Sequence, residues 1–201
     1  QAALADRANR EAEKARRSLA EFVRQAWRYV EPSPFVGGRH VDAICEHLEA
    51  VTRGEILRLL VTVPPRHSKS LIVSVLWPAW IWATRPEWRS LFVSHSSPLA
   101  VEHSRLCRQL VESVWYRTNF GGGWTLAGYQ NAKVHYSTTK GGHRFSIGMT
   151  GGIMGHGGDL VCVDDPLTAT ESWSEAARSE AKRIVGVLPM RLNEPKTGRM
   201  V

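Results

Sequence analysis

The loop from Pro64 to Ser70, with the sequence Pro-Pro-Arg-His-Ser-Lys-Ser, holds the residues whose types and spacing are best suited to chemistry. It follows the apolar run 56–63, which we expect to be a strand, and Lys69 opens a stretch that we expect to be a helix. In such a loop the backbone N–H groups and the positive end of the helix face a phosphate group, the lysine reaches the outer phosphates and the serine hydroxyl ligates Mg²⁺. The pattern predicts a phosphate-binding loop; an ordinary strand-to-helix turn is the alternative.

The loop departs from the consensus G-x-x-x-x-G-K-[ST] at both glycine positions, which are Val63 and Ser68 in this sequence. Ser68 carries a Cβ atom, so its backbone must adopt a negative φ or accept strain. The two prolines have no N–H group, and we expect the donors nearest the phosphates to come from Arg66 to Ser70. The residues predicted to line a nucleotide site are Pro65, Arg66, His67, Ser68, Lys69 and Ser70.

A second element lies downstream, where the apolar run 160–163 ends in the adjacent carboxylates Asp164 and Asp165. This is the form of a Walker B motif, in which the first carboxylate holds Mg²⁺, a cation that prefers oxygen ligands. We therefore expect Ser70 and Asp164 to bind the metal and Asp165 to orient and deprotonate the attacking water, a role more often given to glutamate. The alternative for Asp165 is a helix cap before Pro166.

The composition agrees with a globular protein that meets a polyanion. Lysine and arginine total 26 against 19 for aspartate and glutamate, a net charge of +7 that suits a partner rich in phosphate, although a merely basic soluble protein is the alternative. The three cysteines are far apart, which suggests neither a zinc site nor disulfides and favours a reducing compartment. The sequence has neither an apolar run long enough for a membrane span nor a signal-peptide pattern. We therefore expect a cytoplasmic protein.

Short apolar runs alternate with helical patterns, which predicts an α/β fold with a central, mainly parallel sheet flanked by helices. Trp77, Trp80 and Trp82 are expected to pack against the sheet rather than to stack on bases. We expect an N-terminal amphipathic helix at 1–31 and one further domain at 32–201. The expected helices are 1–30, 39–53, 69–84, 98–116 and 171–187, and the expected strands are 56–63, 90–94, 134–136, 144–147, 160–163 and one beginning near 199.

The motifs together resemble one known family, the large terminase subunits of tailed phages and prophages. The specific parts are the Pro-Pro-Arg-His stretch before Lys69 and the Asp-Asp-Pro sequence that begins at Asp164. Phe92 to Ser96 and the glycine-rich stretches at 141–142 and 151–158 also agree. The resemblance runs from about Pro34 to Val201 and implies a P-loop NTPase of the additional-strand (ASCE) type with an N-terminal helical extension.

The resemblance also implies a function. Such proteins hydrolyse ATP with Mg²⁺ and drive double-stranded DNA into a preformed shell, as a ring of subunits on the portal protein, with a small terminase subunit that recognises the viral DNA. That implies work in the host cytoplasm, at the procapsid portal. A nuclease domain and a coupling motif are expected beyond Val201, so the chain resembles the motor half alone. A helicase-like ATPase and a nucleotide-binding scaffold without hydrolysis are the alternatives.

Further residue roles follow from the resemblance. Arg66 is expected to sense or stabilise the γ-phosphate, with a surface or sheet-edge salt bridge as the alternative. Family members also use an arginine from a neighbouring subunit, and Arg144 is the candidate for it. Pro34, Phe35 and His40 are the candidates for bordering the adenine, with ordinary packing as the alternative for each.

Overall fold

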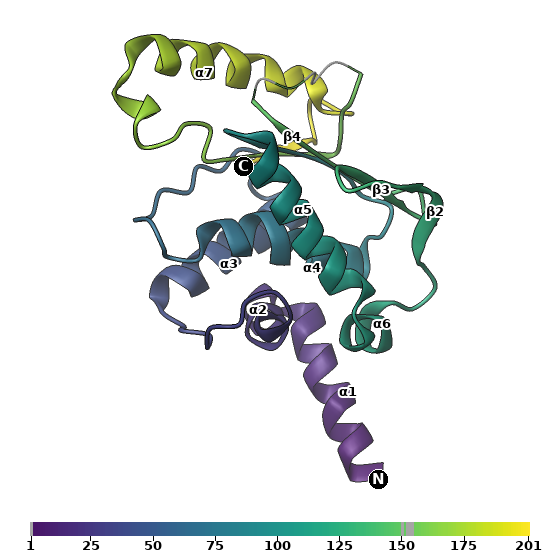
Figure 1. Cartoon of the computed structure of the whole chain (residues 1–201). Coiled ribbons are helices and arrows are strands. Elements are labelled where there is room, and N and C mark those ends of the chain that lie inside the picture. Colours follow the sequence, from purple (N-terminus) through teal and green to yellow (C-terminus); the bar gives the residue numbers. More distant parts are fainter. Residues whose placement is uncertain (1, 150, 152–154) are drawn as a thin grey trace.

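The structure, a computed structural model, describes residues 2–149, 151 and 155–201. It has an α/β architecture in which a six-stranded sheet lies between two layers of helices. Helix α7 (Glu175–Val187) covers one face of the sheet, and α3 (Arg39–Arg53), α4 (Trp77–Thr84) and α5 (Ser97–Glu112) lie on the other (Figure 1). The expected α/β class, with a mainly parallel sheet flanked by helices, is confirmed.

The sheet is mixed, and its parallel part positions the acidic end of β5. The strands, in spatial order, are β2 (Leu126–Asn131), β3 (His135–Thr138), β4 (His143–Gly148), β1 (Arg89–Ser94), β5 (Leu160–Asp164) and β6 (Arg199–Met200). From β4 to β6 neighbouring strands are parallel, and β2, β3 and β4 form an antiparallel meander. Ser94 pairs with Asp164, so β1 and β5 end at the same edge of the sheet. The strands expected at 90–94 and 160–163 are confirmed.

The segment expected as a strand at 56–63 differs from that prediction. It is extended, but among the described residues it forms a single bridge, between Arg58 and Met200 in β6, and no continuous ladder. Two hydrogen bonds hold it there: Leu59 N donates to Met200 O at 3.0 Å, and Met200 N donates to Leu57 O at 2.9 Å.

Two predicted helices are each broken by a serine. The helix expected at 1–30 is divided into α1 (Ala2–Arg17), α2 (Leu19–Ala26) and the short 3-10 helix η1 (Trp27–Tyr29). The break between α1 and α2 lies at Ser18, whose backbone is extended and whose hydroxyl accepts from Glu21 N as the N-cap of α2. The helix expected at 98–116 is α5 followed by α6 (Val114–Phe120), with Ser113 as the cap between them. Serine competes with the helix for backbone hydrogen bonds, which explains both breaks.

The remaining helices follow the sequence patterns more closely. The helix expected at 39–53 is α3, and Gly54 ends it with φ 84°. The helix expected at 171–187 is the 3-10 helix η3 (Glu171–Trp173) and α7, which leads into η4 (Leu188–Arg191). The helix expected at 69–84 contains a π-helical stretch, η2 (Leu71–Leu76), directly before α4.

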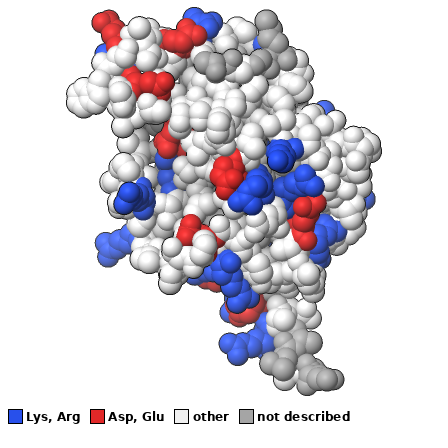
Figure 2. Space-filling view, viewed as in Figure 1, with Lys and Arg blue, Asp and Glu red and all other residues white. Residues whose placement is uncertain are grey.

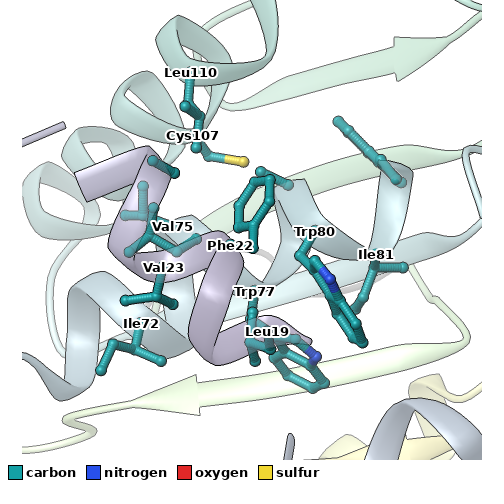
Figure 3. Close-up of a cluster of buried hydrophobic side chains, with 14 of the residues drawn as sticks. Leu19, Phe22, Val23, Ile72, Val75, Trp77, Trp80, Ile81, Cys107 and Leu110 are labelled. Atoms are coloured by element: carbon teal, nitrogen blue, oxygen red, sulfur yellow. The ribbon is translucent and has the colours of Figure 1, made fainter. Parts of the chain in front are cut away.

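The main core joins the N-terminal helices to the helices after the loop. Leu19, Phe22 and Val23 of α2 pack among buried residues of η2, α4 and α5 (Figure 3). The three tryptophans of this region are buried. Trp77 Nε1 donates to Thr52 Oγ1 in α3 and Trp80 Nε1 donates to Ala15 O in α1, whereas the ring of Trp82 contacts Tyr136 of β3. A second cluster joins the opposite face of the sheet to α7.

The cysteines Cys45, Cys107 and Cys162 are buried and free. Among the described residues, no helix has the length and apolar character needed to cross a membrane.

Candidate functional site

The candidate site forms where the loop 64–70 meets the carboxyl end of β5. Lys69 Nζ donates to Asp164 Oδ1 at 2.8 Å and to Asp165 Oδ1 at 2.5 Å. Ser70 Oγ donates to Asp164 Oδ1 at 3.1 Å. The fold therefore brings together the residues that the sequence singled out as phosphate and metal ligands, although they come from segments far apart in the chain.

Asp164 is buried, with 3% of its surface exposed, and both of its carboxylate oxygens have partners. Oδ1 accepts from Lys69 and Ser70, while Oδ2 accepts from Ser74 Oγ at 2.9 Å. His103 Nδ1 on α5 lies 3.6 Å from Oδ2. The sequence interpretation named neither Ser74 nor His103. Ser74 follows Ser70 by four residues on the same helix, a spacing that could have found it.

Charge and hydrogen bonding hold Asp164 ionised against burial. Burial alone would raise the pKa of Asp164, but the hydrogen bonds and charge of Lys69, with the Ser74 hydroxyl, bring the pKa below its ordinary value. Burial likewise opposes the charged form of Lys69, and the bonds from both carboxylates outweigh it and raise the pKa of Lys69. His103 behaves differently, because burial lowers its pKa more than Asp164 raises it. The centre therefore holds an anionic carboxylate and a cationic amine.

Asp165 is more open than Asp164. Its side chain is 54% exposed, and its backbone has φ 48°, in the left-handed region. Its carbonyl oxygen accepts from His95 N at 3.1 Å, which joins it to the segment after β1. No helix begins at Pro166, since the next helical element is η3, so Asp165 does not cap a helix. The exposed carboxylate faces the loop and is open to solvent.

The loop 64–70 lines a pocket of about 280 Å³ together with Val63, Leu71 and Asp165. Arg66 and Ser68 have φ values of 64° and 63°, so Ser68 accepts strain and does not take the negative φ. Each such residue costs on the order of 1 kcal/mol relative to glycine. His67 Nδ1 lies 3.1 and 2.9 Å from the carbonyl oxygens of Pro64 and Pro65 and supports the turn. Arg66 is exposed, and among the described residues no carboxylate pairs with it.

The residues proposed to border the adenine divide into two groups. His40 lies next to the loop, with its ring centroid 5.2 Å from that of His67. Phe35 instead packs against Trp27 at 5.3 Å, in the T-shaped geometry of an ordinary aromatic contact, and Pro34 is exposed. The structure therefore brings His40 beside the loop, but none of the three residues lines the pocket that the loop forms.

Arg144 needs a correction. The sequence interpretation assigned it to a role in a neighbouring subunit's site, which requires an exposed side chain. It is instead fully buried on β4, where Nη1 donates to Ser74 O at 2.7 Å and Nε donates to Ser146 Oγ at 3.0 Å. A guanidinium enclosed in this way does not reach another subunit, so that assignment was wrong.

The arrangement combines groups that suit a phosphate ester and a small divalent cation: an amine, a hydroxyl and a buried carboxylate beside a pocket with backbone N–H groups. Among the described residues, no group of three or more His, Cys, Asp or Glu side chains is placed to hold a metal ion by itself. A metal here would therefore share its ligands with a bound phosphate and water. Comparison with known proteins gave no match, either to a family model or to a curated sequence.

Proposed function

We propose that this chain is the ATP-hydrolysing motor domain of a viral large terminase, which moves double-stranded DNA into a procapsid. The observation that carries the ATPase part is the meeting of Lys69, Ser70 and Asp164, with distances of 2.8 Å and 3.1 Å from Asp164 Oδ1. A lysine and a serine at the start of a helix, facing the carboxylate at the end of a buried parallel strand, form the paired elements of a nucleoside triphosphatase site.

The strand order supports the P-loop type. The extended segment that leads into the loop lies beside β6, and β6 lies beside β5. One strand therefore separates the segment before the loop from the strand with the acidic end, and such an inserted strand is the feature after which the additional-strand type is named. The loop and the acidic end of β5 still meet, because Ser70, directly before η2, donates to Asp164 Oδ1.

The residues present fit Mg²⁺-ATP. Ser70 and Asp164 supply the oxygen ligands that Mg²⁺ prefers, and the bound ion would neutralise phosphate charge. Lys69 would bind the β- and γ-phosphates, with the N–H groups of Arg66 to Ser70 as further donors. Arg66 would stabilise charge on the γ-phosphate, because it is exposed beside the pocket. Asp165 would orient and deprotonate the attacking water.

DNA movement rests on the resemblance in the sequence, together with the net charge of +7. On the face in Figure 2, basic and acidic side chains lie close together over α5, where Arg105 pairs with Glu102 and Arg108 with Glu112. This mixed surface does not single out a DNA-binding set. The proposal includes a ring of copies, a portal protein and a small terminase subunit as partners in the host cytoplasm.

An ATPase assay tests the first part of the proposal. Wild type should hydrolyse Mg²⁺-ATP, while Lys69→Ala, Ser70→Ala and Asp164→Ala should lose most of the turnover. Lys140→Ala is the matched control, because Lys140 is exposed and distant from the loop in sequence. Since isolated motor domains hydrolyse weakly without their ring, the assay is repeated over a range of protein concentrations. Wild-type turnover no faster than that of the variants at every concentration would refute the ATPase.

Two further measurements separate the alternatives. Nucleotide binding without turnover in the wild type would favour a nucleotide-binding scaffold. If turnover is present, stimulation by double-stranded DNA and displacement of a third strand from a DNA triplex support translocation, whereas separation of the two strands of a duplex would favour a helicase-like enzyme.

A further inference from the structure

Arg144 is a fully buried cation next to the candidate site, and its hydrogen bonds point to a role there. Nη1 donates to Ser74 O at 2.7 Å, and the guanidinium carbon lies 3.9 Å from the ring centroid of Phe92. Nη2 is buried and has no hydrogen-bond partner among the described residues. A buried, incompletely paired guanidinium costs stability, and an apolar side chain of similar size often replaces such a charge without loss. Its presence is therefore not explained by stability alone.

The acceptor of the Arg144 hydrogen bond lies at an irregular point of the helix. In an α-helix the carbonyl of Ser74 would accept from the N–H of residue 78, but Pro78 has no N–H group. Residues Leu71–Leu76 are π-helical, and Trp77 N donates to Ile72 O across five residues. Single π-helical turns within α-helices are frequent at functional sites. Arg144 therefore donates to a carbonyl inside this irregular stretch, just before Pro78, where the helix changes its hydrogen-bond pattern.

The same turn carries a ligand of the acidic centre. Ser74 Oγ donates to Asp164 Oδ2 at 2.9 Å, while its carbonyl oxygen accepts from Arg144. Ser74 is buried, and so is the carboxylate that it holds. The path from β4 to β5 therefore runs through one residue of η2, from the guanidinium to the carbonyl and from the hydroxyl to the carboxylate.

We propose that Arg144 is a positioning residue for Asp164 and acts through Ser74. It holds the π-helical turn in the one register that directs the Ser74 hydroxyl to Oδ2, which leaves Oδ1 directed to Lys69 and Ser70. The structural part of this inference stands independently, and its catalytic consequence rests on the proposed function. Partners that orient a metal-binding carboxylate typically change metal affinity or activity by about 10- to 100-fold when they are removed.

The first test needs no nucleotide. The coupling between Ser74 and Asp164 is measured by urea unfolding of Ser74→Ala, Asp164→Asn and the double variant, first with Arg144 and then with Arg144→Met. If Arg144 positions Ser74, the coupling is present with arginine and falls by roughly half or more with methionine. Coupling that is unchanged with methionine overturns the proposal. In a matched control, the same coupling is measured with Ser90→Ala in place of Arg144→Met. Ser90 is buried and lies opposite Arg144 in the sheet register, but the Ser90 hydroxyl donates to His143 O and not to the candidate site.

The second test uses the Mg²⁺ concentration that gives half-maximal ATP turnover. Arg144→Met and Ser74→Ala should each raise this Mg²⁺ concentration about 10-fold or more. The double variant should need no more Mg²⁺ than Ser74→Ala alone, because without the Ser74 hydroxyl Arg144 has no group to direct to Asp164. Additive effects of the two substitutions overturn the path through Ser74. Arg144→Lys serves if the methionine variant fails to fold, and it should give the same non-additivity. If wild type has no turnover, the proposed function fails, and the unfolding cycle still decides the inference.

Discussion

Lys69 Nζ lies 2.8 Å from Asp164 Oδ1, although the two residues are 95 positions apart in the chain. This contact joins the start of η2 to the end of β5 and closes the candidate site. The second carboxylate differs from the first, because Asp165 is mostly exposed while Asp164 is buried. The two acidic residues are therefore expected to respond differently to substitution.

Asp165→Asn should bind ATP nearly as well as wild type but lose about 10²- to 10⁴-fold in turnover, the range for removal of a general base. The amide keeps the shape of the side chain and removes its ability to accept a proton. Binding of a fluorescent ATP analogue and the rate of phosphate release are measured on the same preparation. Equal loss of binding and turnover would contradict the assignment of Asp165 as the base, and Asp42→Asn, at an exposed carboxylate in α3, is the control.

Phe22→Ala should destabilise the whole domain by about 3–5 kcal/mol, the usual cost of removing a buried phenyl ring. Phe22 is fully buried and contacts Phe120 and Tyr116 of α6 with ring centroids at 5.4 Å and 6.3 Å. Urea unfolding is the measurement, and Val36→Ala, at a side chain that is 77% exposed, is the control. A separate early transition in place of one shifted transition would mean that the N-terminal helices unfold independently.

Gly142→Ala should cost about 1–3 kcal/mol, because an added methyl group has no room. A Cβ atom there would lie 2.2 Å from Pro86 O and 2.8 Å from Trp88 O, both of which are backbone atoms. Gly122→Ala is the matched control, since a Cβ atom there meets nothing within 4 Å. Thermal unfolding of both variants gives the comparison, and equal stabilities would show that the backbone at 86–88 moves aside easily.

Stability should fall as the pH is lowered through the ordinary histidine pKa of 6.5, because burial lowers the pKa of both His135 and His143. The neighbouring His143 and His156 lower the pKa of His135 further, and Arg89 lowers that of His143, against a hydrogen bond to Gly157 O. The unfolded chain then binds more protons than the folded chain at pH values just below 6.5. The contribution is therefore fully present above this pH and is lost below it.

Urea unfolding from about pH 8 to about pH 5 measures this dependence. The double variant His135→Gln/His143→Gln should have a flatter profile than wild type over this range. His47→Gln, at an exposed histidine of α3, should leave the slope unchanged. A wild-type profile as flat as that of the double variant would contradict the prediction.

The acidic strand and the helix after the loop were predictable, because their apolar runs have the length and period of a buried strand and a buried helix. The left-handed φ of Arg66 was not predictable from local patterns, and for Ser68 the consensus glycine position left a negative φ and strain both open. The segment expected as a strand at 56–63 forms a bridge to Met200, a partner far along the chain that local sequence patterns do not identify.

Arg144 shows the limit of sequence interpretation at the site itself. A charged residue in a predicted hairpin strand is expected to be exposed. Its buried guanidinium donates to the carbonyl of Ser74, a residue 70 positions away that only the fold brings beside it. Likewise, His103 approaches Asp164 through the rotation of α5, which packing determines. Local patterns carry no information about either contact.

β6 connects the segment before the loop to the acidic strand β5. On one side, Met200 exchanges hydrogen bonds with Leu57 and Leu59, and on the other, Val201 exchanges them with Val161 and Val163 of β5. Among the described residues, the segment that leads into the loop pairs with the sheet at Met200. A displacement of β6 would therefore pull on the backbone of the segment before the loop and on the backbone of the acidic strand together.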